Sequence, residues 1–159
     1  MLLNIVQQNL ESCSANVKIK FLKENAKMPT RGSENAGGWD LYAAIDEPIT
    51  IAPHTTEKIG TGISLALPND TIGAIFARSG LATKKGLAPA NKVGICDADY
   101  RGEYIVALHN HSNEPQIIEP EERIAQLIIL PFYPIIFNEV EELEETERGD
   151  GGFGSTGTN

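Results

Sequence analysis

The amino-acid sequence predicts an all-β fold, and two patterns carry that prediction. Short apolar segments recur along the chain, and several alternate between apolar and polar residues, as Val17, Ile19 and Phe21 do. Turn clusters such as Pro-Asn-Asp and Asn-Glu-Pro separate the segments. The expected strands lie within residues 17–21, 38–44, 55–67, 71–77, 103–110, 115–119 and 123–130.

Signals for helices are few. The segment SGLATKKG at 79–86 predicts a short helical turn, opened by Ser79 and ended by Gly86. The run EVEELEETE at 139–147 contains six glutamates, whose charges repel at helical spacings. We interpret that run as a solvated stretch rather than a metal site. Residues 1–12 fit either an amphipathic helix or an irregular extension.

Length, composition and charge indicate one domain in a reducing compartment. The chain has 159 residues, of which 41% are hydrophobic and 22% charged, as in ordinary soluble domains. Its formal net charge of -9 argues against nucleic-acid binding, which depends on clustered Lys and Arg. Cys13 and Cys96 form no C-x-x-C pair, and no signal peptide or membrane span is evident. We therefore expect a cytoplasmic protein without a nucleic-acid or membrane partner.

The segment ARSGLATKKG at 77–86 offers a candidate phosphate-binding group. The guanidinium of Arg78 matches phosphate oxygens, Ser79 adds a hydroxyl, and Gly80 lets backbone N–H groups approach a ligand closely. The competing interpretation is an arginine beside an ordinary helix cap, and this segment taken alone favours it.

The segment NKVGICDADYRGEY at 91–104 predicts a β-hairpin that carries polar groups. Two aspartates, Asp97 and Asp99, precede Tyr100, and together with Asn91 they offer a base and a shaped pocket. Aspartate is also common in turns for purely local reasons. The spacing therefore does not say which aspartate is functional.

Single polar residues interrupt two apolar strands. Asp40 lies between aromatic residues in GGWDLYAA, where a buried carboxylate needs a pairing cation. Gln126 interrupts RIAQLIIL, and satisfaction of its amide within the core is the default explanation. His109 and His111 would share one strand face, but without a third ligand they predict surface or interface residues rather than a zinc site.

Five segments, taken in order, resemble the five motifs of the trimeric dUTP pyrophosphatases (dUTPases). They are GGWDL, ARSGL, NKVGICDADYRGEY, ERIAQLI and RGDGGFGSTG. The resemblance covers about residue 17 to the end of the chain. It implies a jelly-roll-like β barrel, in agreement with the predicted strands. It also implies a homotrimer with C-terminal tail exchange, in which three subunits build each active site.

The resemblance implies roles for the residues of the third motif. Asp97 matches the catalytic aspartate that orients and deprotonates the attacking water, and Asp99 matches a structural residue. Tyr100 matches the tyrosine that packs against deoxyribose, where a ribose 2′-hydroxyl would clash. Asn91 matches the residue that reads the Watson–Crick edge of uracil, in a pocket too tight for the methyl group of thymine. Backbone groups of further residues assist in that reading, namely Gly94, Ile95, Cys96 and Ile105.

The second, first and fourth motifs are implied to hold phosphates and metal. Arg78, Ser79 and Gly80 match the family's phosphate-binding residues. Asp40 and Gln126 match residues that reach Mg²⁺ through its bound waters, which suits an ion that dehydrates reluctantly.

The glycine-rich terminus also gains a function from the resemblance. Its composition alone is typical of a disordered end, because it buries too little apolar surface to offset its ordering entropy. In this family the last motif is mobile when empty and folds over the bound nucleotide, which excludes water from the site. Phe153 would cover the base, Gly154 would supply flexibility and a backbone donor, and the phosphates would be held by Arg148, Ser155 and Thr156.

The implied activity is hydrolysis of dUTP to dUMP and pyrophosphate, by Mg-assisted attack of an Asp97-activated water on the α-phosphate. Such a reaction limits uracil incorporation into DNA and supplies dUMP for thymidylate synthesis. The implied organisation is an N-terminal extension of unknown role at 1–16, a β-barrel domain at 17–140 and a flexible C-terminal arm at 141–159.

Three residues depart from the family pattern. Ala77 stands where proline is frequent, Cys96 where an aliphatic residue is usual, and Lys92 where a small residue is frequent. They bear on substrate affinity rather than on the reaction. Two alternatives stay open, namely a dCTP deaminase of the same fold and a non-catalytic regulator that binds dUTP. No suitably placed glutamate favours the first, and the intact Asp97 argues against the second.

Overall fold

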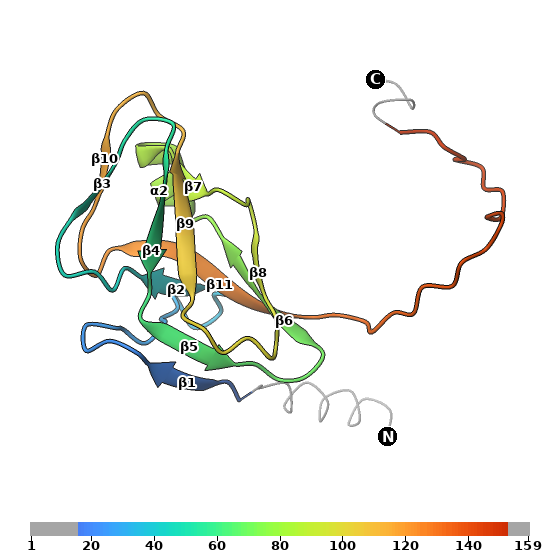
Figure 1. Ribbon diagram of the computed structural model, residues 1–159, viewed down its shortest axis with the longest axis horizontal. Coiled ribbons are helices and arrows are strands. Elements are labelled where there is room, and N and C mark those ends of the chain that lie inside the picture. Colours follow the sequence, from blue (N-terminus) through green and yellow to red (C-terminus); the bar gives the residue numbers. More distant parts are fainter. Residues whose placement is uncertain (1–15, 153–159) are drawn as a thin grey trace.

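The computed structural model describes residues 16–152, which form a β-sheet body and a long C-terminal arm (Figure 1). Over these residues the chain has eleven strands and one short helix. Their bounds are β1 Lys18–Phe21, β2 Trp39–Tyr42, β3 Ile49–Ile51, β4 Thr56–Gly60, β5 Ile63–Ala66, β6 Thr71–Phe76, α2 Ser79–Lys85, β7 Leu87–Pro89, β8 Gly94–Cys96, β9 Ile105–Asn110, β10 Gln116–Ile118 and β11 Arg123–Pro131.

Backbone hydrogen bonds join the strands into four antiparallel sheets. The largest has the strand order β2-β11-β6-β8, and a second has the order β4-β9-β7. Two pairs, β1 with β5 and β3 with β10, complete the body, and Figure 1 shows β4 and β9 running side by side. The all-β prediction is confirmed. The ladders found in residues 16–152 do not close into one continuous barrel.

One hydrophobic core lies inside these sheets. Its members include Leu41 of β2, Ile59 of β4 and Leu108 of β9, all of which are buried from solvent. Buried and more exposed side chains alternate along β9, which is the period of two that predicted a strand. Removal of these apolar side chains from water is the main force that holds the sheets together.

The observed strands differ from the predicted segments in two respects. The segment 55–67 contains two strands, because Gly62 turns the chain with a φ of 67° between β4 and β5. A Cβ atom at Gly62 would lie 2.7 Å from the Cβ of Ala26, so the turn requires glycine. Strands β3 and β7 lie outside the predicted segments, since three residues are too few for a visible alternation.

The predicted β-hairpin at 91–104 is wrong in its pairing. Strand β8 forms its ladder with β6, whereas β9 pairs with β4 and β7. The chain therefore leaves β7, crosses to the edge of the four-stranded sheet and then returns to β9. The reason is that the backbone groups of β8 find partners on β6 rather than on the returning segment.

Helix α2 spans Ser79–Lys85, as the sequence predicts. Gly86 ends it with a φ of 65°, and the Gly86 N–H donates to the carbonyl oxygen of Leu81. Lys84 and Lys85 occupy the last turn, where positive charge is favourable. Within residues 16–152, no helix has the length and apolar character needed to cross a membrane.

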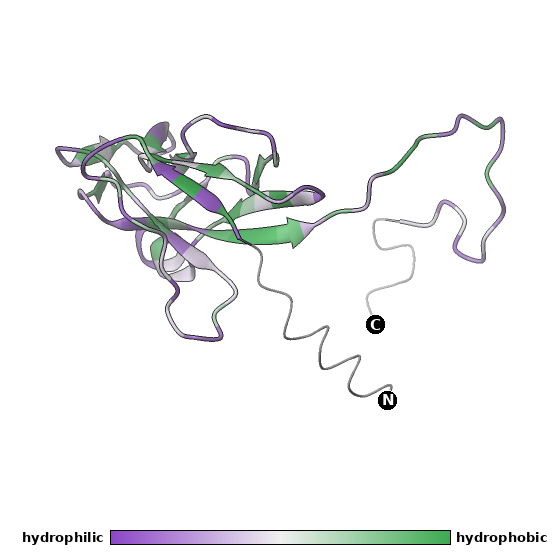
Figure 2. Ribbon diagram, turned by 90° about the horizontal axis from the view of Figure 1, so that it is seen from below, coloured by the Kyte–Doolittle hydropathy of each residue, from purple (hydrophilic) through white to green (hydrophobic). Residues whose placement is uncertain are grey.

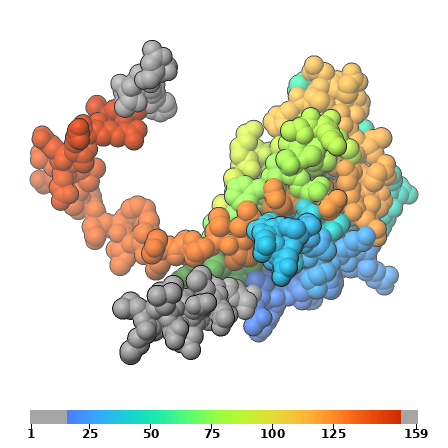
Figure 3. Space-filling view, turned by 180° about the vertical axis from the view of Figure 1, so that it is seen from behind, coloured from blue at the N-terminus to red at the C-terminus, as the bar shows by residue number. Residues whose placement is uncertain are grey.

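The arm consists of residues 132–152 and contains neither strand nor helix. Its first residue, Phe132, donates its N–H to the carbonyl oxygen of Asp70 at 2.9 Å. Figures 2 and 3 show the arm running away from the body, and the hydropathy colours of Figure 2 mark apolar stretches along it. The glutamate run at 139–147 is exposed throughout, as predicted for a solvated stretch. The exposed apolar side chains of the arm include Tyr133, Ile135, Ile136, Phe137, Val140 and Leu143.

Candidate active site

A loop at one edge of the four-stranded sheet carries most of the predicted base-binding residues. The loop, residues 91–104, opens with Lys92 in the left-handed conformation at a φ of 66°. Strand β8 then pairs with β6, and the N–H of Tyr100 donates to the carbonyl oxygen of Asp97 at 3.1 Å. This turn places Asp97 directly after the edge strand and reverses the chain behind it.

The side chains of this loop present an unusual mixture at the surface. The carboxylate of Asp97 and the amide of Asn91 are exposed. Beside them lie three large apolar side chains that are still exposed to solvent. Their exposed fractions are 56% for Ile95, 43% for Tyr100 and 46% for Ile105. Apolar side chains gathered beside polar groups mark a binding surface. We call this loop, with Ile105, the open edge.

Glycines shape the open edge. A Cβ atom at Gly94 would lie 3.3 Å from the Nδ2 atom of Asn91, so Gly94 allows the asparagine to pack against the strand. A Cβ atom at Gly102 would lie 2.5 Å from the Cζ atom of Tyr100, so the tyrosine ring rests on a bare backbone. The Tyr100 hydroxyl donates to the carbonyl oxygen of Glu103 at 3.1 Å and fixes the ring there.

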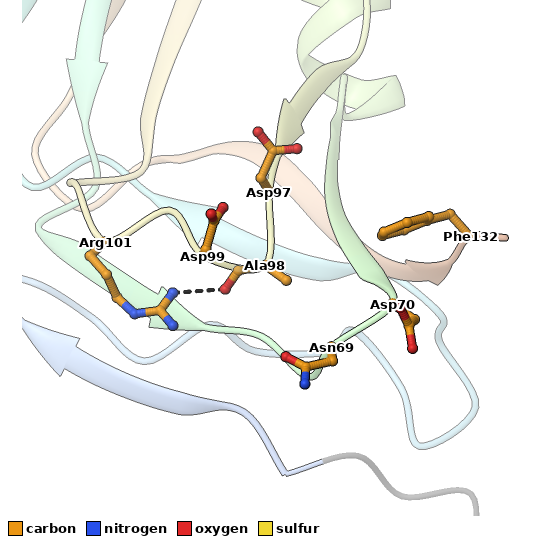
Figure 4. Close-up of a pocket in the computed structure, with 7 residues that line it drawn as sticks. All are labelled: Asn69, Asp70, Asp97, Ala98, Asp99, Arg101 and Phe132. Atoms are coloured by element: carbon orange, nitrogen blue, oxygen red, sulfur yellow. Dashed lines mark hydrogen bonds between the residues drawn. The ribbon is translucent and has the colours of Figure 1, made fainter. Parts of the chain in front are cut away.

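An open hollow of about 660 Å³ adjoins Asp97 (Figure 4). Arg101 borders it and donates to the carbonyl oxygens of Ala98 and Tyr100, at 2.7 and 2.9 Å. These bonds tie the turn after Asp97 into one shape. The lining residues are Asn69, Asp70, Asp97, Ala98, Asp99, Arg101 and Phe132.

The opposite edge of the same sheet carries a compact charged cluster. Asp40 of β2 accepts a hydrogen bond from the Nε of Arg78 at 2.7 Å and another from Arg123 at 3.1 Å. The Asp40 side chain is only 14% exposed, so the two guanidinium groups offset the cost of its partial burial. The prediction that this aspartate needs a cation is confirmed. Arg123 was not among the predicted site residues, because only the pairing of β11 with β2 brings it to Asp40.

Gln126 lies beside Asp40 on the neighbouring strand. The two residues are direct partners in the pairing of β11 with β2, and Gln126 is also the partner of Phe76 on β6. Its Nε2 donates to the carbonyl oxygen of Ala77 at 2.8 Å. A Cβ atom at Gly38 would lie 2.6 Å from its Oε1, so the amide packs against a glycine. We call Asp40, Arg78, Arg123 and Gln126 the paired edge.

The remaining predicted residues lie outside these two groups. Ser79 and Gly80 are exposed in the first turn of α2, next to Arg78. Arg148 lies far along the arm, where its Nε donates to the carbonyl oxygen of Gly151 at 3.0 Å. Four further residues of the expected nucleotide-closing motif lie outside the described residues, namely Phe153, Gly154, Ser155 and Thr156.

The two edges are separated within one chain. Two strands, β11 and β6, lie between β2 and β8. Asp40 is level with Phe76, whereas Cys96, the neighbour of Asp97, is level with Gly73. With strands about 4.8 Å apart and a rise of about 3.4 Å per residue, Asp40 and Asp97 are roughly 15–20 Å apart. A single chain therefore does not bring its predicted phosphate-binding and base-binding residues together.

The histidines form a separate group on the sheet β4-β9-β7. The rings of His109 and His111 lie 4.5 Å apart, and Nδ1 of His109 is 2.9 Å from the hydroxyl of Thr56. Desolvation lowers the pKa of His111, and the charge of the nearby His109 lowers it further. Among residues 16–152 no three His, Cys, Asp or Glu side chains are placed to hold a metal ion. His111 is exposed, as expected of a surface residue, whereas His109 is partly buried.

Comparisons with known proteins agree with the five motifs. The model of the dUTPase family matches residues 24–157. The deoxyuridine 5'-triphosphate nucleotidohydrolase of Desulfitobacterium hafniense is 46% identical over 91% of this chain and 97% of its own length. That of Candida albicans is 43% identical over 98% and 96%.

Solved structures agree as well. The dUTPase of Staphylococcus bacteriophage 80alpha, solved with dUpNHpp, superposes with a TM-score of 0.80. It is 29% identical, over 90% of this chain and 99% of the phage chain. The jelly-roll-like fold predicted from the sequence is thereby confirmed. The chain belongs to the dUTPase family.

Proposed function

We propose that the protein hydrolyses dUTP to dUMP and pyrophosphate. Relatives that cover nearly the whole chain are named deoxyuridine 5'-triphosphate nucleotidohydrolases, and a phage dUTPase of the same fold was solved with dUpNHpp. The observation that carries the proposal is the open edge, where the Asp97 carboxylate stands beside exposed Ile95, Tyr100 and Ile105. An apolar surface with a carboxylate at its side suits a nucleoside whose phosphate is to be attacked.

The nucleoside would bind on the open edge. Asn91 and the backbone groups of Gly94, Ile95 and Cys96 would pair with uracil, with Ile105 beside them. The ring of Tyr100, seated on Gly102, would pack against deoxyribose. A rigid seat of this kind would discriminate by shape against a sugar with an added 2′-hydroxyl.

Asp97 would activate the attacking water. The water oxygen forms a bond to the α-phosphorus, its proton passes to the carboxylate, and the bond from the α-phosphorus to the bridging oxygen breaks. Pyrophosphate leaves and dUMP remains. Carboxylates are weak bases at neutral pH, so most of the contribution of Asp97 would come from orienting the water.

The paired edge would serve the phosphates and Mg²⁺. Asp40 and Gln126 offer oxygen atoms on adjacent strands, and oxygen donors suit Mg²⁺. Both Asp40 oxygens already accept from arginines, which fits contact through water better than direct ligation. The bound ion would supply positive charge that offsets charge on the triphosphate. Arg78, Ser79 and Gly80 would bind the phosphates themselves.

The separation of the edges supports a homotrimer with shared sites and exchanged tails. If Asp97 and the paired edge act on one nucleotide, different subunits must supply them. The arm supports this arrangement, since Tyr133, Ile136 and Phe137 are about nine-tenths exposed and need a surface to cover them. We propose that the terminal segment expected from the sequence, residues 141–159, carries Arg148 and Phe153 to a neighbouring site.

The first experiment is to measure pyrophosphate release from dUTP, dTTP, dCTP and UTP, each with Mg²⁺ and with EDTA. We expect release from dUTP alone, abolished by EDTA. Release of ammonia from dCTP would instead indicate a deaminase. Binding of dUTP without release from any nucleotide would overturn the proposal in favour of a regulator.

A further inference from the structure

Tyr104 is a buried residue whose polar atom has no clear use in the fold. Its side chain is 0% exposed, and it is the largest of the fully buried side chains. Its hydroxyl is the single buried side-chain N or O atom in residues 16–152 that lacks a hydrogen-bond partner. A phenylalanine would fill the same space without burying an unpaired hydroxyl, so the hydroxyl calls for an explanation.

The backbone of Tyr104 is firmly held. Its N–H donates to the carbonyl oxygen of Ile63 at 2.9 Å, and its own carbonyl oxygen accepts from the hydroxyl of Thr61 at 2.5 Å. These bonds tie Tyr104, the last residue of the loop, to the start of β5, and the Ser64 hydroxyl of β5 also donates to the carbonyl oxygen of Arg101 at 2.8 Å. The buried end of the loop is therefore fixed to β5 and carries the Tyr104 ring into the core.

The hydroxyl of Tyr104 reaches the pair of strands that supports Asp97. A Cβ atom at Gly73 would lie 3.3 Å from this hydroxyl, and Gly73 of β6 is the direct partner of Cys96 of β8. Two small residues thus leave the space that the hydroxyl fills. Cys96 is the residue immediately before Asp97.

The Cys96 thiol lies close enough to the Tyr104 hydroxyl for the hydroxyl to influence its pKa. Burial raises the pKa of the thiol, the Tyr104 hydroxyl opposes that effect, and the charge of Asp97 adds to it. The thiol does not satisfy the hydroxyl as a hydrogen-bond partner in the described structure. Sulfur is a weak hydrogen-bond acceptor, so the contact between the thiol and the Tyr104 hydroxyl holds β8 only loosely.

The ring of Tyr104 also supports the other side of the turn. Its centroid lies 6.1 Å from that of Tyr100, with the planes inclined at 49°. Such a tilted pair is attractive for aromatic rings. Tyr104 therefore touches both the strand that ends at Asp97 and the tyrosine proposed to carry the sugar.

We propose that Tyr104 is a positioning residue, whose buried hydroxyl at the Gly73–Cys96 pair and ring against Tyr100 fix Asp97 relative to the sugar. The proposal rests on the proposed dUTP hydrolysis. It explains why an unpaired hydroxyl is retained, since local rules of stability are commonly broken where a site needs a defined geometry.

The test is the variant Tyr104→Phe, with Tyr42→Phe as its matched control. Tyr42 has a paired hydroxyl, 2.6 Å from that of Thr30, on the distant strand β2. For Tyr104→Phe we expect kcat for dUTP to fall about tenfold, because misplacement by less than 1 Å is costly. We expect KM to stay within about twofold, and Tm to stay equal or rise because an unpaired hydroxyl is gone. Tyr42→Phe should leave kcat unchanged.

A merely structural role would give the opposite pattern. An unchanged kcat in Tyr104→Phe, whatever its Tm, would overturn the proposal. So would a fall in kcat that Tyr42→Phe reproduces. In a Cys13→Ser background, the rate of thiol labelling against pH should show a raised pKa for Cys96 once the hydroxyl is removed. No change there would also count against the contact. A wild-type enzyme that releases no pyrophosphate would overturn the proposed function instead, before any variant is compared.

Discussion

The two edges of the four-stranded sheet are built in opposite ways. At the paired edge, Asp40 is held by Arg78 and Arg123, and the amide nitrogen of Gln126 is hydrogen-bonded. At the open edge, Asp97 is exposed and its apolar neighbours face solvent. The polar groups of the paired edge are already held by hydrogen bonds, whereas the apolar groups of the open edge are left uncovered. The difference suits a ligand that is charged at one end and flat and apolar at the other.

The largest expected effect is at the open edge. Asp97→Asn should lower kcat by about 10³-fold or more, because the variant loses the carboxylate proposed to orient the water and accept its proton. Binding of dUpNHpp should change little, since the amide occupies the same space. Pyrophosphate-release assays measure kcat, and calorimetry measures the binding of dUpNHpp.

Asp99→Asn is the matched control for that variant. It lies two residues further along the same turn and is assigned no chemical step. Its kcat should remain within about tenfold of wild type, as expected for a residue outside the reaction. Equal losses in the two variants would remove the basis for choosing Asp97.

The next effect tests the paired edge. Arg78→Lys keeps the charge but loses the planar guanidinium, whose Nε donates to Asp40 and which is proposed to bind phosphate. We expect kcat/KM for dUTP to fall about 10- to 100-fold, because lysine does not replace bidentate arginine. Lys84→Ala, in the exposed last turn of α2, should leave kcat/KM near the wild-type value. A larger effect of Lys84→Ala than of Arg78→Lys would contradict the assignment.

A mixing experiment asks whether the edges come from different subunits. Asp97→Asn and Arg148→Ala chains, each nearly inactive, should recover activity when they exchange subunits. If each site takes Asp97 from one chain and Arg148 from another, an equal mixture should contain roughly a quarter intact sites. Native mass spectrometry would establish the exchange. Exchange without recovered activity would mean that one chain supplies both residues.

The smallest expected effect is on stability, and it compares a glycine packed against the paired edge with a glycine in open space. Gly38→Ala would drive a methyl group against Gln126 and should lower the free energy of unfolding by about 1–3 kcal/mol. At Gly80 nothing lies within 4 Å of an added Cβ atom, so Gly80→Ala should be neutral or stabilising in the helix by about 0.4–1 kcal/mol. Thermal unfolding of both variants measures the contrast. Equal Tm values for the two variants would mean that Gln126 moves aside for the methyl group of Gly38→Ala at no cost.

Much of this architecture could be predicted from the sequence. Short apolar segments bounded by turn residues located strands such as β9 and β11, and a lone carboxylate in β2 required a cation. The order of five motifs identified the residues of the loop, although local pattern alone could not choose between Asp97 and Asp99.

Other features depend on contacts between distant segments. The pairing of β8 with β6 could not be predicted, because a hairpin satisfies the same local pattern. Arg123 joins Asp40 only through the register of β11, and the distance between the two edges is a property of strand order. Nothing in the local sequence marks the Tyr104 hydroxyl as unpaired.

The bond from Phe132 to Asp70 fixes one end of a tether. Fifteen residues, 133–147, separate that point from Arg148, and the sixteen residue steps span roughly 55 Å when fully extended, at about 3.3–3.6 Å per step. A group on such a tether is present around its target at an effective concentration on the order of millimolar, independent of how dilute the protein is. Closure of the terminal motif would then be a first-order event, whose rate depends on tether length rather than on enzyme concentration.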